Sequence, residues 1–252
     1  MRFAANLTWL FTESLMLDRP AKALAAGFDG IEVLFPYDHP PVDWQTALAT
    51  MPVALINAPP GDWAAGERGF AAVPGAEARF RDGFRMALDW AAAMGAERIH
   101  VMAGNASGIE AEAVFGANLE WAAQFGMPLT VEPLNRFDMN GYFLNDFDQA
   151  ARILDDLAIP AIGLQFDLWH AARIHGDPAA VWTRHRGLVS HIQIAGLANR
   201  TEPGGGGFDL TSFVRALSPA LWIAAEYRPA RTTLAGLGWM AALRDPPALI
   251  GA

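Results

Sequence analysis

The sequence has no cysteine and carries little charge, and both features restrict what the protein can be. Without cysteine, disulfide scaffolds, thiolate metal sites and cysteine nucleophiles are excluded. Charged residues make up only 18% of the 252 residues and hydrophobic residues 52%, so disorder is excluded and a large buried core is expected. The 18 Lys and Arg residues are outnumbered by 27 Asp and Glu residues, and the resulting charge of −9 argues against a nucleic-acid-binding protein.

Long hydrophobic runs are also missing. No stretch approaches the roughly 18 uninterrupted apolar residues that a membrane-spanning helix needs. The partly apolar segment over residues 4–17 is interrupted by Asn6, Thr8 and Glu13, and no convincing signal-peptide cleavage site follows it. The sequence therefore predicts a cytoplasmic protein without a membrane partner.

Short apolar runs alternate with helical patterns along the whole chain. The predicted strands cover residues 2–7, 30–35, 53–57, 99–102, 129–131, 163–166, 189–194 and 222–225. The predicted helices cover residues 13–26, 43–51, 77–94, 109–125, 146–157, 178–185, 210–216 and 233–243. Such alternation predicts parallel strands that are joined by right-handed crossovers.

The number of these strand–helix units favours a closed barrel over an open sheet, because about eight units in about 250 residues are typical of the barrel. An open doubly wound sheet should carry a Gly-rich phosphate-binding turn after its first strand, whereas Asn6-Leu7-Thr8-Trp9 stands there instead. No linker or composition break divides the chain. We therefore predict an α/β protein with a single (β/α)8 TIM barrel, one domain over residues 1–252.

Four polar residues stand at the ends of late predicted strands, where a barrel of this type places its active site. They are Glu132 in MPLTVEPLN, Asp167 in IGLQFDLWH, Gln193 in VSHIQIA and Glu226 in LWIAAEYRP. Three carboxylates that converge on one barrel mouth repel one another unless a cation lies between them. An all-oxygen set suits a hard divalent ion, so the sequence predicts a Mg²⁺ or Mn²⁺ site, and zinc is less suitable without His or Cys ligands.

These and neighbouring residues also have simpler explanations. A single carboxylate at a strand end is more often a helix N-cap or a loop anchor, but four such residues on successive late strands are hard to explain in that way. His170 lies three residues after Asp167, and a helical turn there would direct it to the same mouth, although such a histidine is more often structural. Arg136 and Asp138 follow Glu132 and could simply pair with each other.

With these residues identified, the sequence resembles the hydroxypyruvate isomerase family within the xylose-isomerase-like barrels. The matching stretches are RFAANLTWLF, GFDGIEVLFPYD, GDWAAGERG, VEPLNRFD, FDLWH, HIQIA and EYRP. The resemblance implies that Glu132 and Glu226 are the proton-transferring pair. It also implies that the metal ion is held by Glu132, Asp167, Gln193 and Glu226.

The implied reaction is an aldose–ketose type isomerisation of a small 2-oxo or hydroxy acid, from hydroxypyruvate to 2-hydroxy-3-oxopropanoate. Removal of a proton next to a carbonyl produces an enediolate, whose charge a divalent ion can stabilise, while two glutamates take and return the proton. The substrate carboxylate needs a further cation, for which Arg68, Arg200 and Arg228 are candidates. The residues that we expect to bind substrate are His170, Arg68, Arg200, Asp138 and Asn57.

The resemblance leaves other substrates open, because the chain departs from the family pattern at Ile56 and at Gly196-Leu197. A 2-oxo-tetronate isomerase is the first alternative, and a ketose 3-epimerase is the second, with Gln193 in place of an expected His against it. A non-catalytic sugar-acid-binding barrel is more remote. An AP-endonuclease-like hydrolase would need a His-rich metal cluster and a basic groove, which six His and a charge of −9 do not favour. We expect a small-molecule substrate as the partner, and a homo-oligomer is left open.

Overall fold

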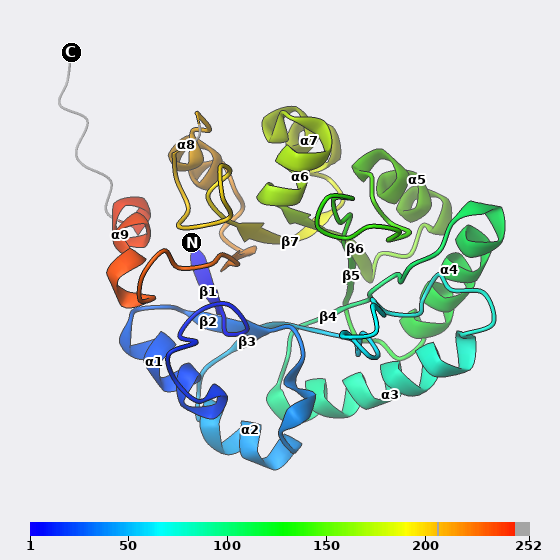
Figure 1. Ribbon diagram of the computed structural model, residues 1–252, viewed down its shortest axis with the longest axis horizontal. Coiled ribbons are helices and arrows are strands. Elements are labelled where there is room, and N and C mark those ends of the chain that lie inside the picture. The colour runs from blue at the N-terminus through cyan, green and yellow to red at the C-terminus, as the bar shows by residue number, and fades with distance from the viewer. Residues whose placement is uncertain (206, 245–252) are drawn as a thin grey trace.

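The structure, a computed structural model, describes residues 1–205 and 207–244. Its eight strands form a closed barrel in which each strand pairs in parallel with the next and β8 pairs with β1 (Figure 1). The strands are β1 (Arg2–Asn6), β2 (Gly30–Val33), β3 (Val53–Asn57), β4 (Ile99–His100), β5 (Leu129–Val131), β6 (Ile162–Asp167), β7 (Val189–Ile194) and β8 (Trp222–Ala225). The predicted (β/α)8 TIM barrel is confirmed.

Helices surround the barrel (Figure 1). They are α1 (Arg19–Ala25), α2 (Pro41–Leu48), α3 (Glu77–Met94), α4 (Gly108–Ala123), α5 (Phe147–Leu157), α6 (Leu168–His175), α7 (Pro178–His185), α8 (Leu210–Arg215) and α9 (Gly238–Arg244), with the 3-10 turns η1 (Met16–Asp18), η2 (Pro36–Asp38) and η3 (Leu234–Gly236). None of the helices in the described part of the chain is both long enough and apolar enough to cross a membrane.

Two predicted helices differ from those in the structure. The helix predicted over residues 13–26 begins only at Arg19, after the turn η1. Pro20 stands in the first turn of α1, where its missing N–H leaves no hydrogen bond unmade. The helix predicted over residues 233–243 is divided into η3 and α9, which meet around Leu237.

One helix, α6, was not predicted. It follows β6 with no intervening loop, so the sequence offers no turn to separate the two elements. Asp167 ends the strand and also begins the helix, because its Oδ1 accepts a hydrogen bond from the backbone N–H of Trp169 at 2.7 Å. Asp167, a predicted metal ligand, is therefore also a helix N-cap, the simpler role that a strand-end carboxylate suggests.

Trp222 occupies the end of the barrel at which the strands begin. It packs with Ala4, Ala54 and Ala224 in a small buried cluster that is separate from the main hydrophobic core. A Cβ atom at Gly30 would lie 2.5 Å from the Trp222 ring, so only glycine fits at this position. Large and small side chains thus fill this end, and the polar strand-end residues lie at the opposite one.

The parallel register brings the polar strand ends to one edge of the barrel. Asp167 of β6 pairs with Gln193 of β7, which pairs in turn with Ala224 of β8. Glu132 and Glu226 directly follow the last residues of β5 and β8. All four predicted metal ligands therefore lie at the carboxyl end of the barrel.

Candidate active site

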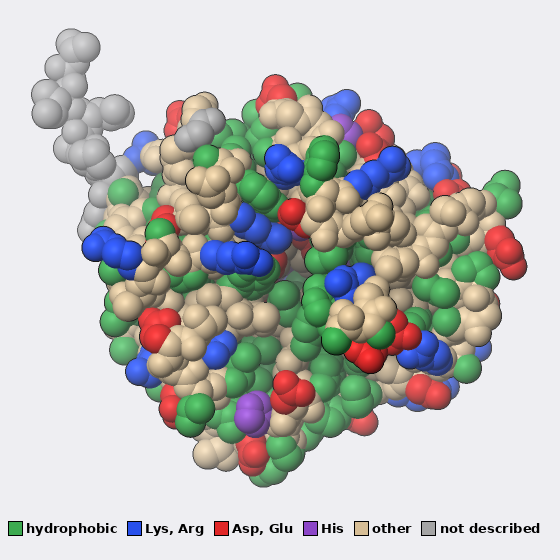
Figure 2. All heavy atoms as spheres, viewed as in Figure 1, with side chains coloured by type: hydrophobic (Ala, Val, Ile, Leu, Met, Phe, Trp, Pro, Cys, Tyr) green, Lys and Arg blue, Asp and Glu red, His purple; other side chains and the backbone are tan. Residues whose placement is uncertain are grey.

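A cavity of about 660 Å³ opens at the carboxyl end of the strands. Figure 2 shows a hollow near the centre of one face, with Lys or Arg side chains beside it. The predicted site residues that line the cavity are Asn57, Arg68, Glu132, Asp138, His170, Arg200 and Glu226. Arg228, His100 and three tryptophans, Trp9, Trp63 and Trp169, also contribute to its wall.

Three buried carboxylates, Glu132, Asp167 and Glu226, form the acidic part of the site. Each has one oxygen that accepts hydrogen bonds of 2.5–2.9 Å from the protein scaffold: Glu132 Oε2 from Gln165, Asp167 Oδ1 from Trp169, and Glu226 Oε2 from Asn6 and Gln193. Because a carboxylate has two oxygens, this arrangement fixes each side chain and leaves its second oxygen for another partner.

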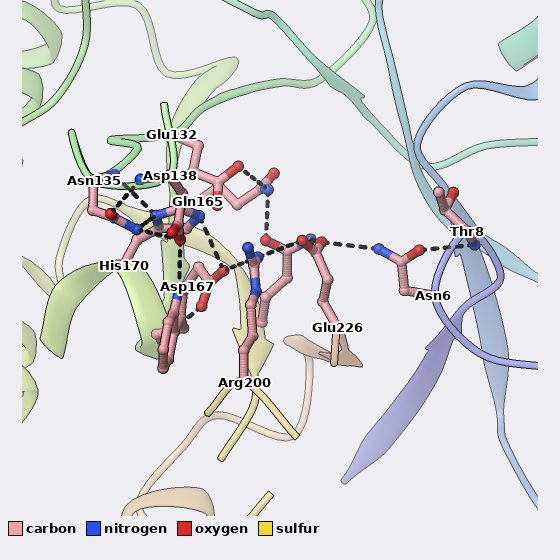
Figure 3. Close-up of polar contacts among 12 residues, drawn as sticks. Asn6, Thr8, Glu132, Asn135, Asp138, Gln165, Asp167, His170, Arg200 and Glu226 are labelled. Atoms are coloured by element: carbon pink, nitrogen blue, oxygen red, sulfur yellow. Dashed lines mark hydrogen bonds and ion pairs between the residues drawn. The ribbon is translucent and has the colours of Figure 1, made fainter. Parts of the chain in front are cut away.

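Arg200 binds the second oxygen of two of these carboxylates (Figure 3). Its Nη2 donates to Asp167 Oδ2 at 3.0 Å and to Glu226 Oε1 at 2.6 Å. The second oxygen of Glu132, Oε1, has no hydrogen bond to the residues that the structure describes. The guanidinium therefore lies between two carboxylates that were predicted to share a metal ion.

Amide side chains connect these carboxylates, and the sequence did not reveal this network. Gln165 on β6 donates through Nε2 to Glu132 at 2.9 Å and to the amide oxygen of Gln193 at 2.8 Å. Gln193 donates through Nε2 to Glu226 and, at 2.7 Å, to Glu32 on β2. The oxygen of Gln193 accepts this one bond and keeps a lone pair that could still bind an ion.

Glu32 is a further buried acid that sequence reasoning missed. It is fully buried and accepts hydrogen bonds from Asn6 Nδ2 at 2.7 Å and from Gln193, and its Oε2 lies 2.7 Å from His191 Nε2. His100, at the end of β4, was missed too, and its Nδ1 lies 3.8 Å from Glu132 Oε2. The one signal for Glu32 was a charged residue inside the apolar run GIEVLF.

His170 has a fixed orientation on α6. Its Nδ1 accepts the backbone N–H of Asn135 at 2.9 Å, so the neutral ring carries its proton on Nε2. Nε2 lies 3.6 Å from Asp167 Oδ2. Burial lowers the pKa of His170 well below its ordinary value, which keeps the ring neutral. The histidine thus presents an N–H donor beside the carboxylates.

Asp138 is held on the wall of the cavity by two donors. Its Oδ2 accepts hydrogen bonds from Asn135 Nδ2 at 2.8 Å and from Trp169 Nε1 at 2.9 Å. The suggested pairing of Asp138 with Arg136 is wrong, because Arg136 donates to Asn145 Oδ1 instead. Asp138 was predicted to contact substrate, and the structure places it where it can do so.

The side chain of Arg68 lines the cavity and has no carboxylate partner among the described residues. Its guanidinium lies 3.7 Å from the centre of the Trp63 ring and donates to the backbone oxygens of Trp63 and Glu67 at 2.9 and 2.7 Å. The carboxylate of Glu67 pairs instead with Arg79 at 2.8 Å. Arg68 thus forms no ion pair with the acidic side chains of its own loop in the described part of the chain, although its hydrogen bonds to two backbone oxygens brace that loop.

Arg228 and Asn57 complete the polar wall. Arg228 lies over Trp9 at 5.0 Å from the ring centre, on the same ring that Arg200 approaches to 5.1 Å. Asn57, at the end of β3, is buried, and its side-chain oxygen has no hydrogen-bond partner among the described residues. An acidic ligand in this cavity would therefore meet cations and an unpaired amide group.

Burial raises the pKa of the carboxyl groups in the cluster, because the charged form loses its hydration. It raises the pKa of Asp167 to about 6, of Glu32 to about 7 and of Glu226 to about 8. The pKa of Glu132 is raised well above its ordinary value by burial and by the charges of Asp167 and Glu226. A cation beside these groups would stabilise their charged forms.

The donor set fits a divalent metal ion. One ligand atom from each of Glu132, Asp167 and His170 lies within 4.8 Å of the other two. Glu226 lies outside this group but shares Arg200 with Asp167. The excess of buried carboxylate oxygen suits a hard cation such as Mg²⁺ or Mn²⁺. Because the Nδ1 of His170 is already bonded and its Nε2 carries the proton, the carboxylates are better ligands than the histidine.

Comparison with known proteins matches residues 20–243 to a family described as xylose isomerase-like TIM barrel. A 2-oxo-tetronate isomerase from Cupriavidus necator is 42% identical over 95% of this chain and 97% of its own. The hydroxypyruvate isomerase of Escherichia coli is 37% identical over 95% of this chain and 98% of its own. A crystal structure described as AP endonuclease, family 2, from Brucella melitensis is 38% identical, with a TM-score of 0.91 and coverage of 97% and 99%.

Proposed function

The chain belongs to the xylose isomerase-like TIM barrel family, and we propose that it isomerises a small 2-oxo or hydroxy acid, converting hydroxypyruvate to 2-hydroxy-3-oxopropanoate. That it is an isomerase follows from the full-length similarity to enzymes of that class, as the sequence predicted. The substrate and the chemistry of the site go beyond this similarity and are argued from the geometry.

The observation that carries the proposal is the arrangement of Glu132, Asp167 and Glu226. Each has one oxygen fixed by the scaffold. Glu132 and Glu226 line a cavity that also holds arginines, and Asp167 lies behind Arg200 of its wall. Fixed acids beside a cavity can exchange protons with a bound substrate, and the arginines that line the same cavity can hold an anionic one.

A divalent ion fits the oxygens of Glu132, Asp167 and Glu226, with Gln193 as a further oxygen ligand. Such an ion, when bound, would stabilise negative charge that develops on two neighbouring oxygens of the substrate. The four predicted ligands reach the same edge of the barrel, which supports this assignment.

Glu132 and Glu226 are the proton carriers in this proposal. They stand on β5 and β8, on different sides of the cavity, so one can remove a proton from one carbon while the other returns it to the neighbouring carbon. Their raised pKa values allow either side chain to hold a proton near neutral pH. The Nε2–H of His170 is placed to donate a hydrogen bond to a substrate oxygen, and it keeps that oxygen oriented.

A substrate panel tests the proposal. We expect the protein, supplied with Mg²⁺ or Mn²⁺, to turn over hydroxypyruvate or 2-oxo-tetronate, and to act on ketohexoses at least about 100-fold more slowly because the arginines of the cavity select an acid. A coupled assay of product formation measures kcat/KM for each compound. A preference for a ketohexose would contradict the proposal and would favour a 3-epimerase.

The second candidate substrate is 2-oxo-tetronate. The Cupriavidus necator relative with this activity is 42% identical. The cavity of about 660 Å³ lies within the range of roughly 300–1,000 Å³ that is typical of pockets for much larger ligands, so a three-carbon acid does not fill it. The same panel decides between the two acids, because they share the head group and differ in length.

Arg68→Ala is expected to lower kcat/KM for a 2-oxo acid by roughly 10- to 150-fold, because one charge-assisted contact to the substrate carboxylate is worth about 1.5–3 kcal/mol. Activity on an uncharged ketose should hardly change. Steady-state kinetics on both substrates measure the difference.

Arg79→Ala is the matched control for this variant. It breaks the ion pair with Glu67 in the same loop but leaves the charge of Arg68 in place. We expect Arg79→Ala to change kcat/KM for the 2-oxo acid and for the uncharged ketose by similar, small factors. If Arg68→Ala also lowers kcat/KM for both substrates equally, Arg68 only braces its loop. Arg228 then becomes the better candidate for binding the substrate carboxylate.

Three further predictions stay predictions: one domain over residues 1–252, a cytoplasmic location and a homo-oligomer. The endonuclease description belongs to the Brucella melitensis structure. In this chain, the formal charge is −9 and the cavity arginines face the barrel mouth, which favours a small acid over a nucleic acid.

A further inference from the structure

The position of Arg200 bears on how the site accepts a metal ion. Glu226 and Asp167 each have one oxygen occupied by scaffold donors, namely Glu226 Oε2 and Asp167 Oδ1. Their remaining oxygens, Glu226 Oε1 and Asp167 Oδ2, are the two that Arg200 Nη2 binds. An ion that used either carboxylate through its uncommitted oxygen would meet the guanidinium there.

Electrostatics makes this sharing unfavourable. Arg200 is nearly buried, with a side-chain exposure of 12%, so its charge is poorly screened from anything bound between Asp167 and Glu226. Two positive groups on the same pair of oxygens repel each other more strongly in such a site than in water. The guanidinium already neutralises part of the charge that an ion would neutralise.

The backbone around Arg200 holds the side chain in this place. Arg200 has a φ of 54°, in the left-handed region that a residue with a side chain seldom adopts. Its N–H donates to the Gly196 oxygen at 2.9 Å, and its own carbonyl oxygen accepts the N–H of Arg228 at 2.9 Å. A strained residue that is fixed on both sides is typical of a functional position.

We propose that Arg200 is an internal cation of the site, which competes with a divalent metal ion for Asp167 Oδ2 and Glu226 Oε1. This inference deepens the proposed function and rests on it, because it assumes that the carboxylates hold a metal. Arg200 then lowers the affinity for the ion, because its guanidinium takes up part of the negative charge of these two oxygens and repels a second cation there.

Mn²⁺ binding to the metal-free protein tests the competition. We expect Arg200→Met to lower the Kd for Mn²⁺ by roughly tenfold or more, because the buried guanidinium no longer repels the ion. Arg200→Gln is a second variant, whose amide can still donate one hydrogen bond and keep the loop in place if the Met variant does not fold. Titration of chelator-treated protein, with free Mn²⁺ measured by electron paramagnetic resonance, gives the Kd without any assay of activity.

Arg228→Met is the matched control. It removes the same charge from the same Trp9 ring, but Arg228 has no bond to a carboxylate among the described residues, so we expect its Kd to change less than about threefold. Unchanged or weaker Mn²⁺ binding in both Arg200 variants overturns the competition, and so does an equal gain in Arg228→Met. If wild type and variants all fail to bind Mn²⁺, the metal centre of the proposed function fails as well. That outcome differs from Mn²⁺ binding that the Arg200 substitutions leave unchanged, which overturns only the competition.

Discussion

Glu132→Gln and Glu226→Gln are each expected to lower kcat by roughly 10²- to 10⁴-fold, because a neutral amide cannot accept the proton that the carboxylate takes. The amide has nearly the same size, and its oxygen can still accept from Gln165 at position 132 and from Asn6 and Gln193 at position 226. Only the bond from Arg200 to Glu226 is then lost, because the amide nitrogen cannot accept it. The fold should therefore survive, and thermal unfolding should show midpoints close to that of wild type. Steady-state kinetics on the preferred 2-oxo acid measure the loss.

Metal affinity separates proton transfer from metal binding in these variants. An amide oxygen can still bind an ion, so we expect Mn²⁺ to bind both variants even where turnover is lost. Glu112→Gln is the control, since Glu112 pairs with Arg152 outside the site. It should keep kcat within about twofold, as expected for an exposed ion pair. Turnover within tenfold of wild type in both site variants would show that the proton carriers lie elsewhere.

The fold could be predicted because the barrel leaves a repeated mark in the sequence. Apolar runs that end in a polar residue or are followed by one recur along the chain, and several of them coincide with strands in the structure, such as Val53–Asn57 and Trp222–Ala225. The helix that was not predicted lies where a strand and a helix adjoin without a turn. The α6 helix begins at Leu168, directly after β6 ends at Asp167, and a pattern of apolar residues cannot separate them.

The site could be predicted only at the strand ends. Glu132 and Glu226 stand out because each follows an apolar run. Glu32, Gln165 and His191 lie inside strands, and the strands of a parallel barrel are buried on both faces. Their sequence therefore does not alternate, and nothing in it tells which residues point to the barrel axis.

Contacts between distant loops could not be predicted at all. The sequence placed Arg200 among the candidates for the substrate carboxylate, but not beside Asp167, 33 positions earlier in the chain. The loop after β7 folds back on itself through the N–H of Gly196, which donates to the Thr201 oxygen at 2.8 Å. This turn places the guanidinium of Arg200 beside the carboxylates of Asp167 and Glu226.

Removal of the metal is the second large expected effect. Treatment with a chelator should abolish turnover, and Mg²⁺ or Mn²⁺ should restore it. The metal-free protein should also lose stability as the pH rises from about 6.5 to 8, because its buried acids are then forced to ionise without a metal ion. The groups concerned have pKa values raised by burial, to about 6 for Asp167, about 7 for Glu32 and about 8 for Glu226.

The sign of this pH effect follows from proton counting. In the unfolded chain these acids lose their protons near about pH 4, whereas in the folded chain Asp167, Glu32 and Glu226 keep theirs to higher pH. Above about pH 6.5 the histidines of the unfolded chain are neutral too, so the folded state binds more protons and the free energy of unfolding falls as the pH rises. Below that pH the lowered pKa values of the buried His100, His170 and His191 act in the opposite direction. Acids with a lowered pKa, such as Glu67 bonded to Arg79, act only at lower pH. We expect the Tm of the metal-free protein to fall by several degrees over this range, because each loss of about 1 kcal/mol lowers the Tm of a domain of this size by about 2–4 °C.

Mn²⁺ should reverse this loss, because the ion replaces the protons. The rise in Tm on adding Mn²⁺ should be larger at about pH 8 than at about pH 5.5, where protons compete for the same oxygens. Glu226→Gln is the matched variant: it removes the acid with the pKa of about 8, so the fall of its metal-free Tm with pH should be shallower. Thermal unfolding followed by circular dichroism, with and without Mn²⁺, measures both slopes. A metal-free Tm that stays constant or rises between about pH 6.5 and pH 8 would contradict buried carboxylates that a metal ion compensates, as the proposed function requires.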